Sequence, residues 1–151
     1  MVIISVGNFK NKLLKEIFND YFKRIKRYIS IKNIIIKDSN KKESNLKKID
    51  EENKINSYLT KLNTYTVCLS EEGTLFSTKN FSDFIKKNMG LKQKLCFIVG
   101  GSDGFSDTFK QKANIILSLS KLTFPHELAR VILIEQIYRS IKIIKGEPYH
   151  K

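Results

Sequence analysis

The sequence predicts one α/β domain over residues 1–151, with a mostly parallel sheet flanked by helices. The length suffices for a single domain with a proper core and is too short for two domains of ordinary size. Short β-branched runs alternate along the chain with segments of helical periodicity. The run from Lys94 to Val99 is almost continuously apolar, as in a strand that is covered on both faces.

The first part of the chain begins with a strand and a helix. Val2 to Gly7 is a short β-branched run closed by glycine, and residues 11–28 repeat apolar side chains at helical spacing. A second strand is predicted over 31–36. Residues 38–54 are so polar that we expect their beginning to form a mobile surface loop, with helix resuming only toward Leu62.

The middle of the chain repeats this order. A third strand is predicted over 65–69 and leads to a turn around Gly73. Ser77 or Thr78 is placed to cap a helix that ends near Met89. With the strand that ends at Val99, the alternation of strands and helices indicates parallel crossovers.

The charge of the chain is strongly positive. Its 28 Lys and Arg residues outnumber 15 Asp and Glu residues, giving a net charge of +13 that favours polyanions such as nucleic acid. Lysine is abundant throughout, so the charge also fits a general compositional drift. The few arginines are more informative than the lysines, because each stands in a chain that otherwise uses lysine as its basic residue. They are Arg24, Arg27, Arg130 and Arg139.

Other classes of protein receive no support from the composition. The two cysteines, Cys68 and Cys96, lie in separate apolar runs and are expected to be buried reduced thiols. No His or Cys cluster has the spacing of metal ligands, so we expect no metal. No apolar stretch has the length of a membrane span, and the start of the chain lacks the order of a signal peptide. A soluble cytoplasmic protein is the expectation.

Two motifs after Val99 indicate a ligand site. The first, Gly100 to Gly104, follows a predicted strand directly, where glycines let a ligand approach the backbone and the next helix start offers free N–H groups. A tight turn without a ligand explains the same residues equally well. The motif matches neither of the common phosphate-binding glycine patterns.

The second motif is a bend between a predicted strand, residues 115–120, and a long helix. Pro125 suits a first helical turn, Thr123 is a possible cap, and Gly146 is placed to end the helix. Backbone groups in the bend can bind a purine edge while apolar side chains form walls. An ordinary connection is the alternative. The apolar side chains are Leu119, Leu122 and Phe124.

The long helix is apolar nearly all round, because residues 131–134 are four consecutive apolar residues. We therefore expect one face to pack on the sheet and another on a partner subunit, most simply in a homodimer. Full burial within one chain is the alternative. Glu135 and Arg139 lie at i and i+4, so they form either an ion pair or a site where Arg139 faces an acidic substrate.

The tail GEPYHK carries an aromatic ring, an imidazole and an amine after the glycine that stops the helix. Tyr149 and His150 are suited to stacking on an unpaired base, and Lys151 to contacting a phosphate. Chain ends are often frayed, so a disordered tail is the alternative.

These motifs resemble those of a known family. VGGSDG, SLSKLTFPHELARVILIEQIYR and GEPYHK occur in the order found in the ribosomal large-subunit methyltransferase H family, the smallest members of the SPOUT methyltransferases. The resemblance is dense over residues 97–151 and looser upstream. Two places depart from the family pattern: Ser70 stands where an acidic residue is usual, and Thr78-Lys79 replace a serine-glutamate cap.

The resemblance implies an α/β fold with a C-terminal trefoil knot, a homodimer, and S-adenosylmethionine bound in the knot. The implied reaction is methylation at N3 of a pseudouridine in large-subunit rRNA, with the assembled ribosome as the expected substrate. Family positions near the target nucleobase correspond to Arg139, Tyr149 and His150. His150 is the candidate general base, which accepts the N3 proton. Family positions at the cofactor correspond to Leu69, Gly100, Leu119, Ser120, Lys121, Leu122, Thr123 and Phe124.

Two alternatives to this function stay open. A SPOUT methyltransferase can instead act on tRNA or on a ribose 2′-hydroxyl. A basic RNA-binding protein of ribosome assembly, with a cofactor pocket that no longer works, belongs to a different class. Primer extension across rRNA distinguishes the first alternative from the implied reaction, since N3 methylation blocks pairing. The affinity for S-adenosylmethionine distinguishes the second alternative from an active methyltransferase.

Overall fold

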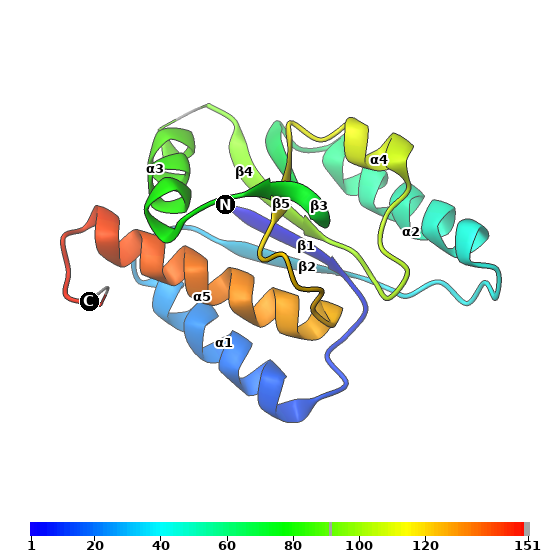
Figure 1. Ribbon diagram of the computed structural model, residues 1–151, viewed down its shortest axis with the longest axis horizontal. Coiled ribbons are helices and arrows are strands. Elements are labelled where there is room, and N and C mark those ends of the chain that lie inside the picture. Colours follow the sequence, from blue (N-terminus) through cyan, green and yellow to red (C-terminus); the bar gives the residue numbers. More distant parts are fainter. Residues whose placement is uncertain (91, 150–151) are drawn as a thin grey trace.

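A five-stranded parallel sheet forms the centre of the protein (Figure 1). The computed structural model describes residues 1–90 and 92–149. The strands are β1 (Val2–Val6), β2 (Lys32–Ile36), β3 (Thr64–Leu75), β4 (Lys94–Val99) and β5 (Ile115–Ser118). Their order is β2-β1-β4-β3-β5, and every neighbouring pair is parallel. The prediction of a parallel α/β sheet is confirmed.

Helices cover both faces of the sheet. They are α1 (Lys12–Lys26), α2 (Ser44–Leu59), α3 (Thr78–Met89), α4 (Asp107–Gln111) and α5 (His126–Ile144). Helices α1, α3 and α5 lie on one face, and α2 and α4 lie on the other (Figure 1). Because side chains alternate along each strand, the sheet contributes to two separate apolar cores, of which the one under α1, α3 and α5 is larger.

Helix α2 begins earlier than the sequence indicated. Only residues 37–43 are irregular, and the helix starts at Ser44 within the segment predicted to begin as a loop. Its buried residues are Glu51, Glu52 and Ile55, so two of the three are carboxylates. The apolar periodicity that marks a helix is therefore weak here, because this helix turns charged side chains inward.

Strand β3 continues through the turn predicted around Gly73, so that prediction is wrong. The pairing of β3 with β5 shifts register between Leu69 and Thr74, which leaves a bulge over residues 70–73. A Cβ on Gly73 would lie 2.5 Å from the carbonyl carbon of Leu117 in β5. Glycine is needed there for a close approach of two backbones within the sheet.

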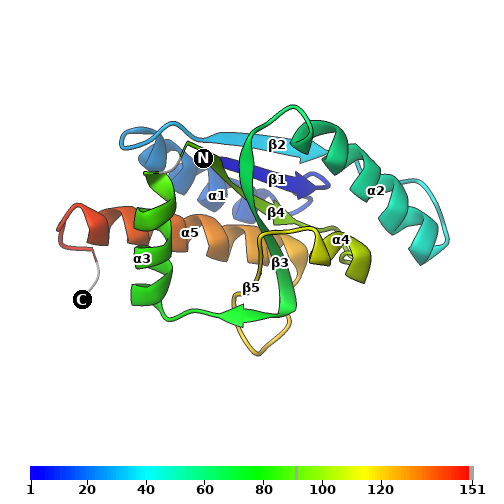
Figure 2. The same ribbon diagram turned by 90° about the horizontal axis from the view of Figure 1, so that it is seen from above.

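Helix α5 packs between α1 and α3 against the sheet. The chain leaves β5 through a bend that leads into this helix (Figure 2). Every residue from His126 to Ile144 is buried or half-buried, so the neighbouring helices of the same chain cover much of the apolar circumference. Gly146 follows the helix with φ of +67° and ends it as predicted.

The first turn of α5 is fastened to the loop between β1 and α1. Glu127 accepts hydrogen bonds from the backbone N–H of Lys10 and of the next residue, both at 3.1 Å. Arg130 is 0% exposed, donates from Nη1 to the carbonyl oxygen of Gly7 at 2.8 Å, and stacks over the ring of Phe9 at 4.0 Å. Burial lowers the pKa of Arg130 to about 10, so it remains charged at neutral pH.

The two cysteines are free and buried, as predicted. Burial raises the pKa of Cys68 and of Cys96 to about 12, so both thiols stay protonated and unreactive at neutral pH. In the part of the chain that the structure describes, no helix is long and apolar enough to cross a membrane.

Candidate active site

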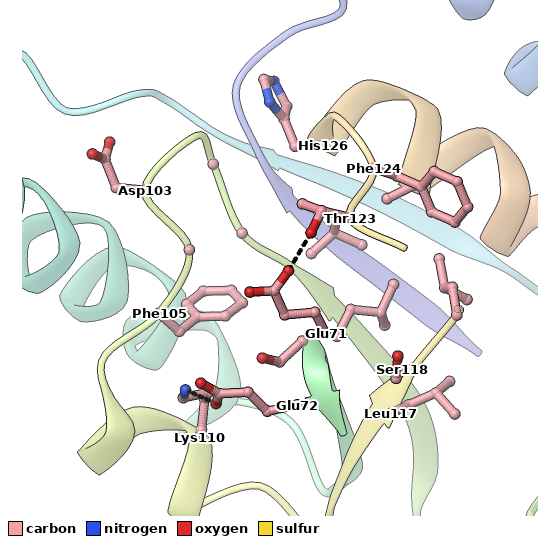
Figure 3. Close-up of a pocket in the computed structure, with 18 of the residues that line it drawn as sticks. Glu71, Glu72, Asp103, Phe105, Lys110, Leu117, Ser118, Thr123, Phe124 and His126 are labelled. Carbon is pink, nitrogen blue, oxygen red and sulfur yellow. Dashed lines mark hydrogen bonds and ion pairs between the residues drawn. The ribbon is translucent and has the colours of Figure 1, made fainter. Parts of the chain in front are cut away.

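A cavity of about 870 Å³ opens at the carboxyl ends of β3, β4 and β5 (Figure 3). Three segments enclose it: the bulge of β3, the bend after β5, and residues 100–106 after β4, here called the glycine loop. Ligands of open parallel sheets bind at this edge, because strand ends and helix starts leave room and free backbone groups there.

Seven of the eight residues expected at the cofactor line this one cavity. The exception is Lys121, which is exposed and does not line it. Apolar side chains line both sides of the opening. The seven residues are Leu69, Gly100, Leu119, Ser120, Leu122, Thr123 and Phe124. Two motifs separated by about twenty residues in the sequence thus form a single site.

The bend is held by the bulge of β3 rather than by a helix cap. Thr123 was expected to cap α5, but its Oγ1 donates to Oε2 of Glu71 at 2.5 Å (Figure 3). The N-cap position of α5 is Pro125, which makes no side-chain cap bond. Glu71 therefore connects two of the three segments around the cavity.

The lining of the cavity carries more negative than positive charge, although the chain as a whole has a charge of +13. Four carboxylates and two lysines line it; they are Glu71, Glu72, Asp103, Asp107, Lys48 and Lys110. A basic chain with an acidic pocket favours a cation in the pocket and a polyanion outside it.

Most of these carboxylates are already neutralised. Lys110 binds Glu72 and lies 2.8 Å from Asp107, and these bonds raise the pKa of Lys110. The ammonium of Lys47, 2.5 Å away, lowers the pKa of Asp103. Glu71 differs, because its hydrogen-bond partner is the neutral hydroxyl of Thr123. It is the carboxylate best placed to attract a cationic ligand.

The helix after the glycine loop does not offer a free N-terminus. Helix α4 is only five residues long, and Ser106 caps it by accepting from the backbone N–H of Phe109. The N–H of Ser106 itself donates to Glu52 at 2.6 Å. Two of the N–H groups that were predicted to be free for a ligand are thus bonded within the chain.

Two of the three residues expected near the target base form a separate cluster at the far end of α5. Arg139 donates to Glu135 from Nη2 at 2.6 Å and lies over the ring of Tyr149 at 4.8 Å. The predicted ion pair is confirmed. The Tyr149 hydroxyl lies 3.2 Å from Glu135 and from Tyr21, and its burial raises its pKa, so it is a donor at neutral pH. His150, the candidate base, lies outside the described residues.

The cluster and the cavity lie at opposite ends of α5. Thirteen residues separate His126, which lines the cavity, from Arg139, and a helix rises by 1.5 Å per residue, so about 20 Å lies between them. One chain therefore does not bring Arg139 and Tyr149, the two described members of the expected catalytic set, to its own cavity.

The sequence did not point to Glu71, Glu72 or Lys110 as residues of the site. A signal was present, because the two carboxylates come shortly after Leu69, where the sequence predicted the end of the third strand. The acidic residue that the family pattern places at Ser70 has its nearest counterpart one position later. Lys110 gave no local signal, since it resembles every other lysine of the chain.

Comparison with known proteins identifies the class. The family model described as "Predicted SPOUT methyltransferase" matches residues 1–150. A structure of a probable methylase family protein from Haemophilus influenzae Rd KW20 aligns with a TM-score of 0.61 and 10% identity, over 99% of this chain and 70% of that one. The likeness in structure supports the same fold.

Curated relatives give the family within that class. The ribosomal RNA large subunit methyltransferase H of Clostridium acetobutylicum is 41% identical over 100% of this chain and 99% of its own. The protein of the same name from Mycoplasma mycoides is 43% identical over 99% of this chain and 97% of its own. This chain belongs to the ribosomal RNA large subunit methyltransferase H family of SPOUT methyltransferases.

Proposed function

We propose that this protein transfers a methyl group from S-adenosylmethionine to N3 of a pseudouridine in large-subunit rRNA of the assembled ribosome. The observation that carries the proposal is the cavity at the carboxyl edge of the sheet, where separate motifs expected to bind the cofactor come together. Membership of the methyltransferase family supports the reaction and its substrate.

The residues of the cavity fit S-adenosylmethionine. Its sulfonium and ammonium groups are cationic, and Glu71 supplies a carboxylate that no lysine neutralises among the described residues. Apolar side chains suited to a purine face the same cavity from β3, β5 and the bend; they are Leu69, Leu117, Leu122 and Phe124. We assign the cofactor to this cavity.

When bound, S-adenosylmethionine supplies an electrophilic methyl group on a cationic sulfur. The protein has to hold the target base in line with that methyl and to accept the N3 proton. His150 is the proposed proton acceptor, because an imidazole titrates near neutral pH. Arg139 is the proposed contact for the anionic base or a phosphate, since its planar guanidinium stays charged. Tyr149, a donor at neutral pH, orients Arg139 by stacking.

The 20 Å separation along α5 favours a site shared between two chains. We propose that the protein is a homodimer in which the tail of one chain reaches the cavity of its partner. A half-buried stripe along the outer side of α5 supports this interface, and its residues are Leu128, Ile132, Gln136, Arg139 and Ile143. Beside it on α1, Leu13 is 69% and Ile17 is 44% exposed. These apolar side chains are suited to a two-fold contact.

Ile17→Glu is expected to dissociate the dimer, raising its dissociation constant by at least about tenfold, because it buries a charge in an apolar contact. The monomer should still fold, since Ile17 is already half exposed. Ile49→Glu is the matched control: Ile49 is 51% exposed on α2, on the opposite face of the sheet. Light scattering during gel filtration measures both variants. A monomeric Ile49→Glu, or a dimeric Ile17→Glu, contradicts the proposed interface.

We also propose the C-terminal trefoil knot of the family. The path of the chain supports it: the glycine loop and the bend after β5 enclose one cavity. From there α4 and α5 lie on opposite faces of the sheet (Figure 1). A knot requires in addition that the end of the chain pass through a closed loop, and this threading is part of the proposal.

Transfer of tritiated methyl from S-adenosylmethionine tests the proposed function. We expect incorporation into large-subunit rRNA when assembled ribosomes are the substrate, at least about tenfold above naked rRNA, because a domain of this size relies on the folded particle for specificity. Primer extension should then stop at one pseudouridine. Incorporation into tRNA, or a modified 2′-hydroxyl, assigns a different substrate. If the protein neither binds S-adenosylmethionine nor incorporates methyl groups into RNA, the alternative of a non-catalytic RNA-binding protein is favoured.

A further inference from the structure

Helix α2 contacts the glycine loop at three places. Lys47, Glu51 and Glu52 lie at i, i+4 and i+5 of this helix and therefore on one side of it. Each meets a different part of the loop, which lines the cavity through residues 100–105. More than forty residues separate the helix from the loop in the sequence, so these contacts are tertiary.

Glu52 holds the end of the loop. Its two carboxylate oxygens accept from the backbone N–H of Ser106 at 2.6 Å and from the Ser106 hydroxyl at 2.9 Å. A buried carboxylate that accepts a backbone N–H and a hydroxyl makes strong, oriented bonds. The preceding residue, Phe105, presents its ring to the cavity and stacks on Phe109 at 4.8 Å. The bonds of Glu52 thus fix the position of a cavity wall.

Lys47 holds the middle of the loop. Its Nζ donates to Oγ of Ser102 at 2.8 Å and to Oδ2 of Asp103 at 2.5 Å. Ser44, one turn earlier on α2, donates to the other oxygen of Asp103 at 3.1 Å. The middle and the end of the loop are therefore both bound to one helix.

Glu51 lies against the start of the loop. It is 2% exposed, and its Oε1 accepts from the backbone N–H of Ser39 at 3.0 Å. Its Oε2 has no hydrogen-bond partner within residues 1–90 and 92–149 and lies 3.2 Å from the place of a Cβ on Gly101. A side chain at Gly101 would crowd this carboxylate, so the close approach of loop and helix favours glycine there.

We propose that α2 is a clamp that holds the glycine loop in the shape that binds the methyl donor, with Glu52 as the principal positioning residue. The inference rests on the function proposed above and adds a residue outside the cavity to the binding machinery. A loop fixed before the ligand arrives does not lose conformational entropy on binding, so the clamp acts on affinity. It leaves the transfer step at saturating donor unchanged, because Glu52 touches neither reactant.

Glu52→Ala tests the clamp, with Asp50→Ala as the matched control. Asp50 is an acidic residue of the same helix that pairs with Lys54 at 2.6 Å and does not touch the loop. Calorimetry of S-adenosylhomocysteine binding should show a dissociation constant about tenfold higher for Glu52→Ala and unchanged for Asp50→Ala. The KM for S-adenosylmethionine should rise in parallel, while kcat stays within about twofold. Hydrogen exchange at residues 101–106 should accelerate only in Glu52→Ala.

Two further measurements keep the outcomes distinct. Glu52→Gln retains an oxygen that accepts from the Ser106 N–H, so its affinity should return to within about threefold of the natural protein. If Glu52→Ala does not fold, Ser106→Ala keeps the backbone bond to Glu52, removes the hydroxyl bond together with the side-chain cap of α4, and is expected to weaken binding in the same direction. Unchanged affinity and unchanged exchange in a folded Glu52→Ala overturn the clamp. A natural protein that binds no S-adenosylhomocysteine overturns the proposed function instead.

Discussion

Removal of residues 149–151 is expected to lower methyl transfer by at least about 100-fold. The deletion takes away His150, the proposed proton acceptor, and the Tyr149 ring that stacks on Arg139, and either loss removes a group proposed to act at the target base. Affinity for S-adenosylhomocysteine should change by less than about twofold, because the tail is proposed to contact the target base, whereas the cofactor is held by the sheet edge, the glycine loop and the bend. Methyl transfer to ribosomes and calorimetry measure the two effects.

Two point variants separate the contributions of the tail. Tyr149→Phe keeps the ring packed on Tyr138, 4.9 Å away, and removes only the hydroxyl bonds. Its activity should fall much less than that of the deletion. His150→Ala should reproduce most of the loss if His150 accepts the proton. Full activity of the truncated protein on ribosomes contradicts the proposed role of the tail.

Gly73→Ala is expected to destabilise the protein by about 3 kcal/mol and to abolish binding at the cavity. A Cβ at this position meets backbone atoms of β5 at 2.5–2.7 Å, and backbone that is paired within a sheet cannot yield as a side chain does. Relief requires β3 and β5 to separate, which moves the bulge that carries Glu71. Urea unfolding followed by circular dichroism measures the stability.

Gly90→Ala is the control for that experiment. Gly90 has φ of −83°, and a Cβ there meets only the Lys87 carbonyl oxygen at an ordinary 3.8 Å. Alanine at a compatible φ reduces the freedom of the unfolded chain, so this variant should be as stable as the natural protein or slightly more so. Equal stability of the two variants would show that β5 tolerates a methyl group at Gly73.

Local patterns predicted most of the fold because most elements obey local rules. Strands β1, β2 and β4 and helices α1 and α3 have the expected periods, and Ser77 caps α3 as predicted. The errors fall where distant segments decide the structure. Helix α2 is stabilised by bonds from its carboxylates to a loop about fifty residues away, and β3 continues past Gly73 because β5 lies against it. Neither partner is visible in a short window of sequence.

The candidate site was predictable to a similar extent. Taken separately, the glycine loop and the bend each fitted a ligand site and an ordinary turn or connection equally well. Only their resemblance to a known family assigned both motifs to one site. The structure places both at one cavity. What the sequence did not reveal was the electrostatic design, in which an acidic pocket lies in a basic chain. That property depends on which carboxylates meet lysines in space: Lys110 neutralises Glu72 and Asp107, whereas Glu71 meets a hydroxyl.

The fastening of α5 to the first loop sets the order in which the molecule is completed. The bond from Arg130 to Gly7 joins residues that are 123 positions apart, and every strand pair of a parallel sheet also needs a distant partner. The entropy of closing such long loops is lost before the contacts are gained, which slows folding. During synthesis the loop after the first strand therefore stays without its partners on α5 until almost the whole chain has been made.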